Sequence, residues 1–278
     1  MSPVHFGSQP SPNQSISPTT PLASQANRHH WDNDARDYHE RHAAYLESFY
    51  WCPEMLHEQD LQLVGDITDQ TVLEIGCGSA PCSTWLAHTF PTATVLGFDI
   101  SVRMLQHAKA TLSDKTSQGN KHSASNLHLI QADATALPFA ANSFDVIFSA
   151  FGALPFIEDL QELFKNVAAL LRPGGRFIYS INHPMRWVFP DDPSEAGLIA
   201  AIPYFETCYM ETENNTVTYI EFQHTFGDHV RALAGAGLLL ENVIEPQWPS
   251  DLRQTWGQWS PTRGAIFPGT AIFLSRLP

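Results

Sequence analysis

The residues best suited to chemistry lie where short apolar runs end. Gly76-Cys77-Gly78 follows the run Thr71–Ile75, and Asp99 follows the run Thr94–Phe98. Glycines permit a tight turn and let a ligand approach the backbone, and a carboxylate can accept two hydrogen bonds from the vicinal diol of a ribose. Asp99 stands 23 positions after Gly76, close to the roughly 20 typical of dinucleotide-binding folds. The spacing indicates a nucleotide site, although a plain tight turn and a helix-capping or surface aspartate would leave the same residues.

Asp133 is a third candidate of the same kind. It follows the apolar run Leu127–Ala132. The carboxyl ends of parallel strands meet at one edge of a sheet, where folds of this type bind their ligands, so the three markers are expected to lie together. A nicotinamide-dinucleotide fingerprint needs a third glycine, in the pattern GxGxxG. The chain has Pro81 at that point, which weakens the nicotinamide alternative.

Strands that alternate with helices must position these residues. Five buried strands and three helices are expected, over 71–75, 94–98, 127–132, 144–150 and 176–181, and over 80–88, 101–112 and 157–171. Two more strands are expected over 238–245 and 269–277. The alternation predicts an α/β fold with a doubly wound, mostly parallel seven-stranded sheet and helices on both faces.

The rhythm breaks after the fifth expected strand. Residues 183–203 are rich in proline and tryptophan, and 204–210 and 216–222 can pair as a hairpin. We expect residues 183–236 to form a small aromatic cap that receives the substrate. Tryptophans outside the central pattern suit an apolar lid over a small organic molecule or a satellite core beneath long loops. They are Trp31, Trp51, Trp187, Trp248, Trp256 and Trp259.

The N-terminal part is expected to comprise a tail and a helical segment. Residues 1–27 contain no Asp, Glu, Lys or Arg, and they cannot bury enough surface to offset their ordering entropy, so they are predicted to be disordered. Residues 28–70 are predicted to be largely helical, because Trp31, Ala35 and Tyr38 fall on one helix face. Residues 71–278 would then form the main domain.

Composition limits the classes of function. The 278 residues carry a formal net charge of −14, which argues against nucleic acid as a partner. No apolar stretch approaches the roughly 20 residues that cross a bilayer, so no membrane partner is expected. The four cysteines match neither a zinc nor a redox motif, and no histidine spacing typical of a metal site is present. With no secretory signal visible, a cytoplasmic protein with reduced thiols is expected; its oligomeric state stays open.

Five segments carry a family resemblance. They are Val72-Leu73-Glu74-Ile75-Gly76-Cys77-Gly78, Phe98-Asp99-Ile100-Ser101, Ala132-Asp133-Ala134 with Leu137-Pro138-Phe139, Phe144-Asp145-Val146-Ile147, and Leu171-Arg172-Pro173-Gly174-Gly175. In order and spacing, residues 71–181 resemble a class I S-adenosylmethionine-dependent methyltransferase of the type 11 group. The resemblance implies a Rossmann-like sheet and S-adenosyl-L-methionine as cofactor, and it makes 71–278 the methyltransferase domain. Ala80 is a departure, because many members of the family carry a glycine there.

The resemblance also implies where the methionine portion of the cofactor binds. The backbone around Gly76 and Gly78 would cradle it, and Glu74 would help to hold its ammonium group, through water. Ala150 would lie beneath the methionine arm.

The adenosine portion is expected at the next two strand ends. By the same resemblance, Asp99 takes the ribose hydroxyls and Ile100 or Met104 packs on the adenine. Asp133 faces the adenine amino group, and the Ala134 backbone N–H lies opposite a ring nitrogen. Trp31 and Tyr38, on the N-terminal helix, would close over the cofactor or pack against the core.

Two histidines are the candidates for the catalytic side. His183 follows the fifth strand and His224 follows the hairpin; a histidine can take a proton from a hydroxyl or amine acceptor, and each could equally be structural. The interpretation is a methyltransferase that aligns a small-molecule acceptor in line with the sulfonium methyl. The alternatives are a nicotinamide-nucleotide oxidoreductase and a non-catalytic regulator that binds S-adenosylmethionine. The sequence leaves open whether O, N, C or S is methylated.

Overall fold

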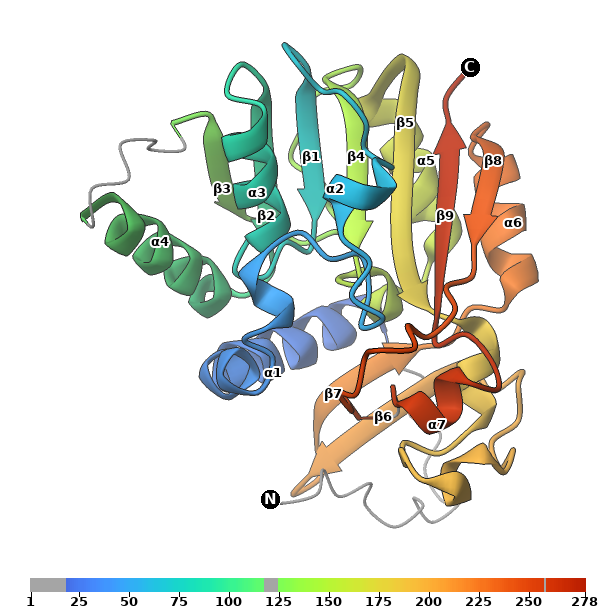
Figure 1. Ribbon diagram of the computed structural model, residues 1–278. Helices are drawn as coiled ribbons and strands as arrows, with labels where there is room; N and C mark the ends of the chain where they lie inside the picture. The colour runs from blue at the N-terminus through green and yellow to red at the C-terminus, as the bar shows by residue number, and fades with distance from the viewer. Residues whose placement is uncertain (1–18, 118–124, 258) are drawn as a thin grey trace.

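A seven-stranded sheet forms the centre of the protein (Figure 1). The computed structural model describes residues 19–117, 125–257 and 259–278. The sheet has the order β3-β2-β1-β4-β5-β9-β8. Its strands are β1 (Thr71–Ile75), β2 (Thr94–Asp99), β3 (Leu127–Gln131), β4 (Phe144–Ala150), β5 (Leu171–Asn182), β8 (Leu239–Ile244) and β9 (Thr270–Arg276). β1 to β5 run parallel, and β9 is antiparallel to both β5 and β8. The expected mostly parallel α/β sheet is confirmed.

Both faces of the sheet are apolar. Leu73 and Ile147 belong to one core cluster, whereas their neighbours Val72 and Val146 belong to another. Successive side chains of a strand point to opposite faces, so each strand contributes to both layers. This is the pattern of a parallel sheet that is covered on both sides.

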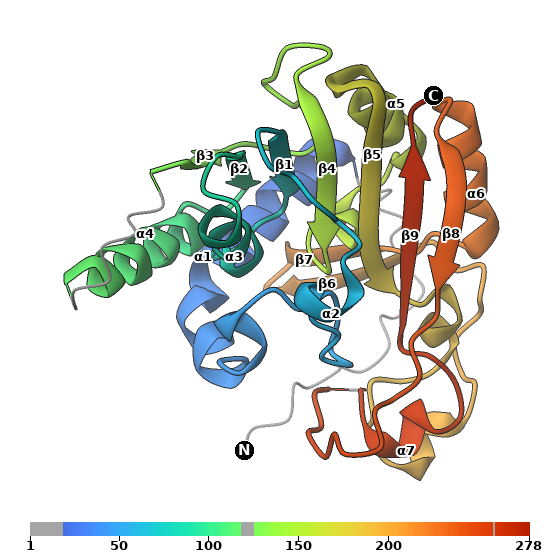
Figure 2. The same ribbon diagram turned by 45° about the horizontal axis from the view of Figure 1, so that its top comes forward.

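Helices supply the two covers (Figure 2). α5 (Leu160–Leu170) and α6 (Phe226–Gly235) pack against each other on one face, and α3 (Pro81–Thr89) and the short α2 (Glu58–Leu61) lie on the other. α4 (Val102–Ser117) packs beside β2 and β3. Within the described ranges, no helix has both the length and the apolar character needed to cross a membrane.

The cap is smaller than the expected range 183–236. It contains the 3-10 helices η3 (Pro184–Val188) and η4 (Glu195–Leu198) and the hairpin of β6 (Cys208–Glu213) and β7 (Thr216–Phe222), and α7 (Pro261–Gly264) contacts η4. α6 does not belong to it. Thr225 and Asp228 form a capping box that starts α6, and Leu233 is buried in the core on the α5 face.

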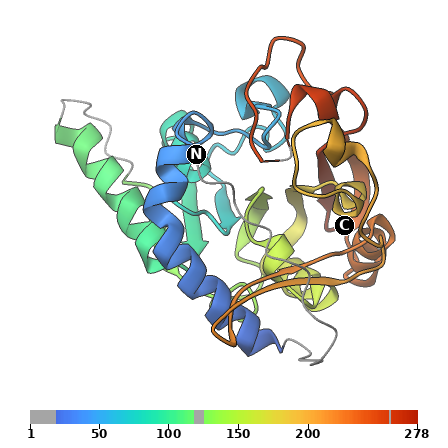
Figure 3. The same ribbon diagram turned by 90° about the horizontal axis from the view of Figure 1, so that it is seen from below.

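The N-terminal helix begins earlier than expected. α1 spans Thr20–Arg41 and is followed by the 3-10 helix η1 (Tyr45–Glu47). The prediction of disorder over 1–27 is therefore wrong from residue 20 onward, and residues 1–18 lie outside the described part. Ala23 packs in a cluster with Ile220 of β7, which supplies the burial that the segment could not achieve alone. Seen from below, α1 runs across the strand ends beside α4 (Figure 3).

Candidate active site

A cavity of about 340 Å³ lies between the carboxyl ends of the strands and α1. That volume is in the range of sites for small organic ligands. All eleven residues expected around the cofactor line it, namely Trp31, Tyr38, Glu74, Gly76, Gly78, Asp99, Ile100, Met104, Asp133, Ala134 and Ala150. We call these residues the glycine-turn half of the cavity.

The two glycines of the turn have different tasks. Both have positive φ angles, +68° at Gly76 and +55° at Gly78, a conformation that side chains disfavour. A Cβ atom at Gly76 would lie 2.7 Å from the Cβ of Ala153, whereas one at Gly78 would meet nothing within 4 Å. Gly76 thus allows close packing of the turn, and Gly78 leaves a bare stretch of backbone. Ala80 also takes a left-handed conformation, with φ of 58°, which explains why a glycine suits this position.

Asp99 ties the turn to the end of β2. Its Oδ2 accepts a hydrogen bond from Gly78 N, and its Oδ1 accepts one from Ser101 N, both at 2.8 Å. Burial raises the pKa of Asp99 to about 6, because water no longer solvates the charged form. A ligand hydroxyl that donates to this carboxylate would restore part of the lost solvation.

Glu74 lies beneath the turn, 2% exposed. Its Oε2 accepts hydrogen bonds from the backbone N–H of Ser83, at 3.0 Å, and from the Ser83 hydroxyl. Burial is the largest influence on this carboxyl and raises its pKa to about 8, against the opposing effect of the Ser83 bonds. A buried carboxyl of this kind favours a cation beside it.

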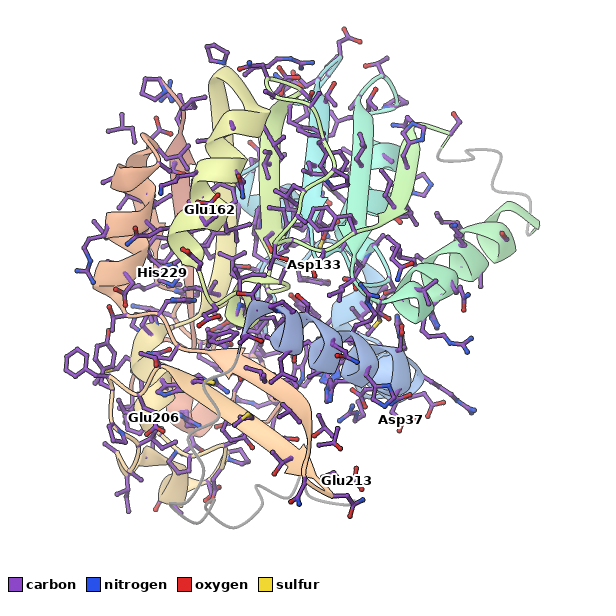
Figure 4. The ribbon with its side chains drawn as sticks, turned by 180° about the vertical axis from the view of Figure 1, so that it is seen from behind. Asp37, Asp133, Glu162, Glu206, Glu213 and His229 are labelled. Carbon is purple, nitrogen blue, oxygen red and sulfur yellow. The ribbon has the colours of Figure 1, made fainter. Side chains whose placement is uncertain are left out.

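The third carboxylate lies at the end of β3. Asp133 Oδ1 accepts hydrogen bonds from Thr135 N at 2.9 Å and Thr135 Oγ1 at 2.8 Å, which fixes the loop after the strand. Figure 4 shows Asp133 at the strand ends, close to α1. Met104 and Ile100 add apolar surface nearby in the cavity lining, so this corner offers a flat apolar site with a polar edge.

Aromatic side chains of α1 cover the cavity. The Trp31 ring makes edge contacts with the rings of Tyr38, at 5.5 Å, and Phe156, at 5.7 Å. Asp32 fastens α1 to the start of α4, since its Oδ1 accepts a hydrogen bond from Ser101 Oγ at 2.7 Å. α1 is thereby held next to Ser101, whose backbone N–H donates to Asp99.

The two candidate catalytic histidines are not brought to this cavity. His183 accepts a hydrogen bond from Met185 N at its Nδ1, and its Nε2 lies 2.8 Å from Glu245 Oε1. His224 Nε2 lies 2.8 Å from the carbonyl oxygen of Ile157, and burial lowers its pKa. Both line a much smaller neighbouring pocket of about 20 Å³. The expectation that they face the mouth of the large cavity is wrong; both ring nitrogens of His183 and the Nε2 of His224 are engaged in local structure.

Other residues complete the large cavity on the side of the cap. We call them the cap half; they include Asn182, Arg186, Tyr219, Glu221, Trp256 and Trp259. Sequence reasoning missed the four polar members. Two signals were available: Asn182 is the last residue of β5, directly before His183, and Tyr219 and Glu221 share one face of a strand through their i, i+2 spacing.

The expected aromatic lid is present only in part. Trp31, Trp256 and Trp259 line the large cavity. Trp51 is instead fully buried in the core, and Trp187 lines the smaller pocket. The described residues contain no group of three or more His, Cys, Asp or Glu side chains arranged to hold a metal ion.

Comparison with known proteins gives the central domain an identity. A family model described as "Methyltransferase domain" matches residues 72–175. A malonyl-[acyl-carrier protein] O-methyltransferase of Xylella fastidiosa (strain M23) is 33% identical over 69% of this chain and 63% of its own length. A demethylmenaquinone methyltransferase of Lactococcus lactis subsp. lactis (strain IL1403) is 32% identical over 45% of this chain and 47% of its own. The chain thus spans about half to two thirds of the length of these relatives.

Solved structures agree with the fold. An S-adenosylmethionine-dependent methyltransferase from Mesorhizobium loti superposes with a TM-score of 0.58 and 22% identity, over 78% of this chain and 96% of that one. Geranyl diphosphate C-methyltransferase from Streptomyces coelicolor A3(2), with S-adenosyl-L-homocysteine bound, superposes with a TM-score of 0.55 and 14% identity, over 89% of this chain and 84% of that one. At these identities the likeness concerns the fold alone. The family match and the strand order agree, and residues 72–175 form a methyltransferase domain with the fold of S-adenosylmethionine-dependent methyltransferases.

Proposed function

We propose that the protein transfers a methyl group from S-adenosylmethionine to a small organic acceptor. One observation carries the proposal: a single cavity joins the glycine turn and Asp99, on one side, to a second set of polar and aromatic side chains in the cap half. A protein that only bound the cofactor would need no such second half. The joined cavity sets the side chains of the cap half opposite the glycine turn, where an acceptor would meet the cofactor.

The residues of the glycine-turn half fit this cofactor. The bare backbone at Gly78 lets a ligand approach closely, and buried Glu74 suits an ammonium group. The carboxylate of Asp99 suits the two hydroxyls of a ribose. S-adenosylmethionine, when bound, supplies a methyl group that is already activated by its sulfonium charge.

The chain's own contribution is then to orient the partners and exclude water. Trp31 and Tyr38 cover the cavity from α1, and the cap closes the opposite side. Holding two reactants in the correct orientation can lower the activation barrier by several kcal/mol. One relative is named for a malonyl group carried on an acyl-carrier protein and another for demethylmenaquinone, and the second name is in keeping with a small organic acceptor.

Calorimetry on the full chain tests the proposal first. S-adenosylmethionine and S-adenosylhomocysteine should bind, and NADH should not. Binding of NADH alone would replace the proposal by a nicotinamide enzyme. A screen of metabolites for uptake of labelled methyl then identifies the acceptor, and cofactor binding without transfer to any metabolite would favour a regulator.

A further inference from the structure

Glu221 is the centre of a polar cluster in the cap half of the cavity. Its Oε1 accepts a hydrogen bond from Asn182 Nδ2 at 3.1 Å and lies 3.7 Å from Arg186 Nη1. Its Oε2 accepts a hydrogen bond from Tyr219 Oη at 3.4 Å. The side chains of Arg186 and Glu221 are only 15% and 14% exposed. The end of β5, η3 and β7 therefore converge on one carboxylate, and all four residues line the cavity.

The surroundings of this cluster are aromatic. Phe151 and Phe156 line the cavity together with Trp256 and Trp259, and the guanidinium of Arg186 lies over the Trp259 ring, 5.3 Å from its centroid. Such walls suit an apolar, ring-shaped molecule. The polar cluster is the part of the cap half that can recognise a polar group on that molecule.

The charges of the cavity disfavour an anionic acceptor. Among its described lining residues, four side chains are acidic (Glu74, Asp99, Asp133 and Glu221) and one, Arg186, is a Lys or Arg. Arg186 is matched by Glu221 at 3.7 Å, so an acceptor carboxylate would have to compete with Glu221 for the guanidinium. Burying a second anion beside a first is costly. A neutral acceptor avoids this cost.

A neutral acceptor raises the question of its proton. When a hydroxyl oxygen or an amine nitrogen gains a methyl group, it must lose a hydrogen ion, whereas a carboxylate has none to lose. In a cavity covered by α1 and the cap, a positioned side chain is the efficient recipient. No histidine is among the described lining residues, and the cap half offers a carboxylate instead.

We propose that Glu221 is the base that takes the proton from a neutral acceptor, one that bears a hydroxyl or amino group on an apolar ring. In the step, a bond forms between the acceptor O or N and the methyl carbon while the S–CH3 bond breaks and its electron pair stays on sulfur. The O–H or N–H proton passes to Glu221. The positively charged sulfonium becomes a neutral thioether and the negatively charged carboxylate becomes a neutral carboxylic acid, so the charges balance. The inference rests on the proposed methyl transfer.

The environment of Glu221 supports a proton-accepting role. Burial raises its pKa, and Arg186 acts in the opposite direction as the largest lowering influence. A raised pKa makes the carboxylate a stronger base. Other titratable groups near it come from the segment after η3, the hairpin and α1, and they are Asp191, Tyr209, Tyr219 and, through its ring contact with Tyr219, His30. Glu221 also lines the smaller pocket, where the titratable groups are His183, His224 and His229. Asp191 adds to the upward shift.

The test uses ring compounds of one size that differ in their polar group: 2-naphthol, 2-naphthylamine and 2-naphthoate. Calorimetry measures their binding to the complex of the full chain with S-adenosylhomocysteine, in wild type, Glu221→Gln and Glu213→Gln. Glu213 lies at the end of the same hairpin, is exposed and lines none of the cavity (Figure 4). The naphthol or the amine should bind wild type and Glu213→Gln alike, and at least about tenfold more weakly to Glu221→Gln. Whichever of 2-naphthol and 2-naphthylamine binds more tightly indicates whether the acceptor presents a hydroxyl oxygen or an amine nitrogen.

Rates with labelled S-adenosylmethionine provide the second readout. Glu221→Gln should lower turnover of the bound probe by about 10²–10⁴ and remove the decline in rate at acidic pH that protonation of the base causes. Preferred binding of naphthoate, no binding of either neutral probe, or a Gln variant that keeps both affinity and acid limb would overturn the proposal. In the last case Glu221 merely anchors Arg186. S-adenosylhomocysteine binding, measured first on each variant, separates failure of this inference from failure of the proposed function.

Discussion

At the scale of single residues, the cavity concentrates carboxyl groups that are costly to bury. Glu74 and Asp99 accept hydrogen bonds from backbone N–H groups of Ser83, Gly78 and Ser101, yet burial still raises both pKa values. Desolvation therefore outweighs hydrogen bonding at both carboxyl groups. A cationic or hydroxyl-bearing ligand would stabilise the ionised carboxylates in place of water. These groups therefore favour ligand binding, while their burial lowers the stability of the fold without ligand.

Glu74 should make cofactor binding depend on pH. Its pKa is about 8 in the ligand-free protein, so at pH 6.5 it is mostly protonated, while an ammonium group favours the ionised form. Binding should release a proton, and affinity for S-adenosylmethionine should rise by up to about tenfold per pH unit between pH 6.5 and 7.5. Calorimetry in buffers of different ionisation enthalpy measures this release. Glu74→Gln should bind more weakly and independently of pH; an unchanged pH dependence in that variant would assign the proton elsewhere.

Asp99→Ala should weaken cofactor binding strongly. It removes hydrogen bonds to a charged group, each contributing about 1.5–3 kcal/mol, or roughly tenfold to more than a hundredfold in affinity. Asp37→Ala is the matched control, because Asp37 is an exposed acid on α1 (Figure 4). Near-UV circular dichroism checks that both variants are folded. Equal affinity of the two variants in calorimetry would remove Asp99 from the site.

At the scale of elements, α1 and β7 act as one lid. Asn27 Nδ2 donates to the carbonyl oxygen of Ile220, and Ile220 N donates to Asn27 Oδ1, both at 2.9 Å. A side chain of the helix thereby completes the edge of the hairpin strand. Since Trp31 comes from α1 and Glu221 from β7, this pair of hydrogen bonds couples the covers of the two halves of the cavity.

Asn27→Ala should loosen that lid. It leaves the buried N–H and C=O of Ile220 without these partners, at about 1–3 kcal/mol for each unsatisfied group, so thermal unfolding should move down by several degrees and cofactor affinity should fall. Asn33→Ala, on an exposed turn of the same helix, controls for helix propensity. Deletion of residues 1–27 removes the same contacts and should lower thermal stability and cofactor affinity as much. A truncated chain with wild-type stability and affinity would show that the two hydrogen bonds contribute nothing.

At the scale of the whole molecule, local and long-range positions differ in how far sequence predicts them. The glycine-turn half could be predicted because Gly76, Asp99 and Asp133 each lie within two residues of the carboxyl end of a strand, and parallel strands bring such positions to one edge. Asn182 and Glu221 come together only when the cap folds back, which no local pattern encodes. The start of α1 was missed for a similar reason: its first turns lack charge and are stabilised by packing on β7.

The stability of the ligand-free protein should fall between pH 7.5 and 8.5. Burial lowers the pKa values of several histidines, to about 4 at His42 and about 3 at His229, and they weaken the fold below about pH 7.5, where the unfolded chain takes up protons and the folded one does not. Above that pH the folded protein still holds much of a proton on Glu74 that the unfolded chain has lost, so raising the pH disfavours folding.

Thermal unfolding without ligand at pH 7.5 and pH 8.5 measures this effect. The melting temperature should fall across the interval in wild type and much less in Glu74→Gln, and saturating S-adenosylmethionine should also reduce the fall. A wild-type melting temperature that is flat or rising over the interval would show that Glu74 is already ionised in the ligand-free fold.

The Asn27–Ile220 pair joins residues 193 positions apart, and this separation sets an order of events during synthesis. α1 leaves the ribosome well before the strand against which it docks. The nascent protein can form β1 to β5 and still have its cavity uncovered, with the aromatic face of α1 in water. Completion of the lid is thus a late, non-local step. A nascent chain stalled before β7 would carry the glycine turn and yet have no closed site.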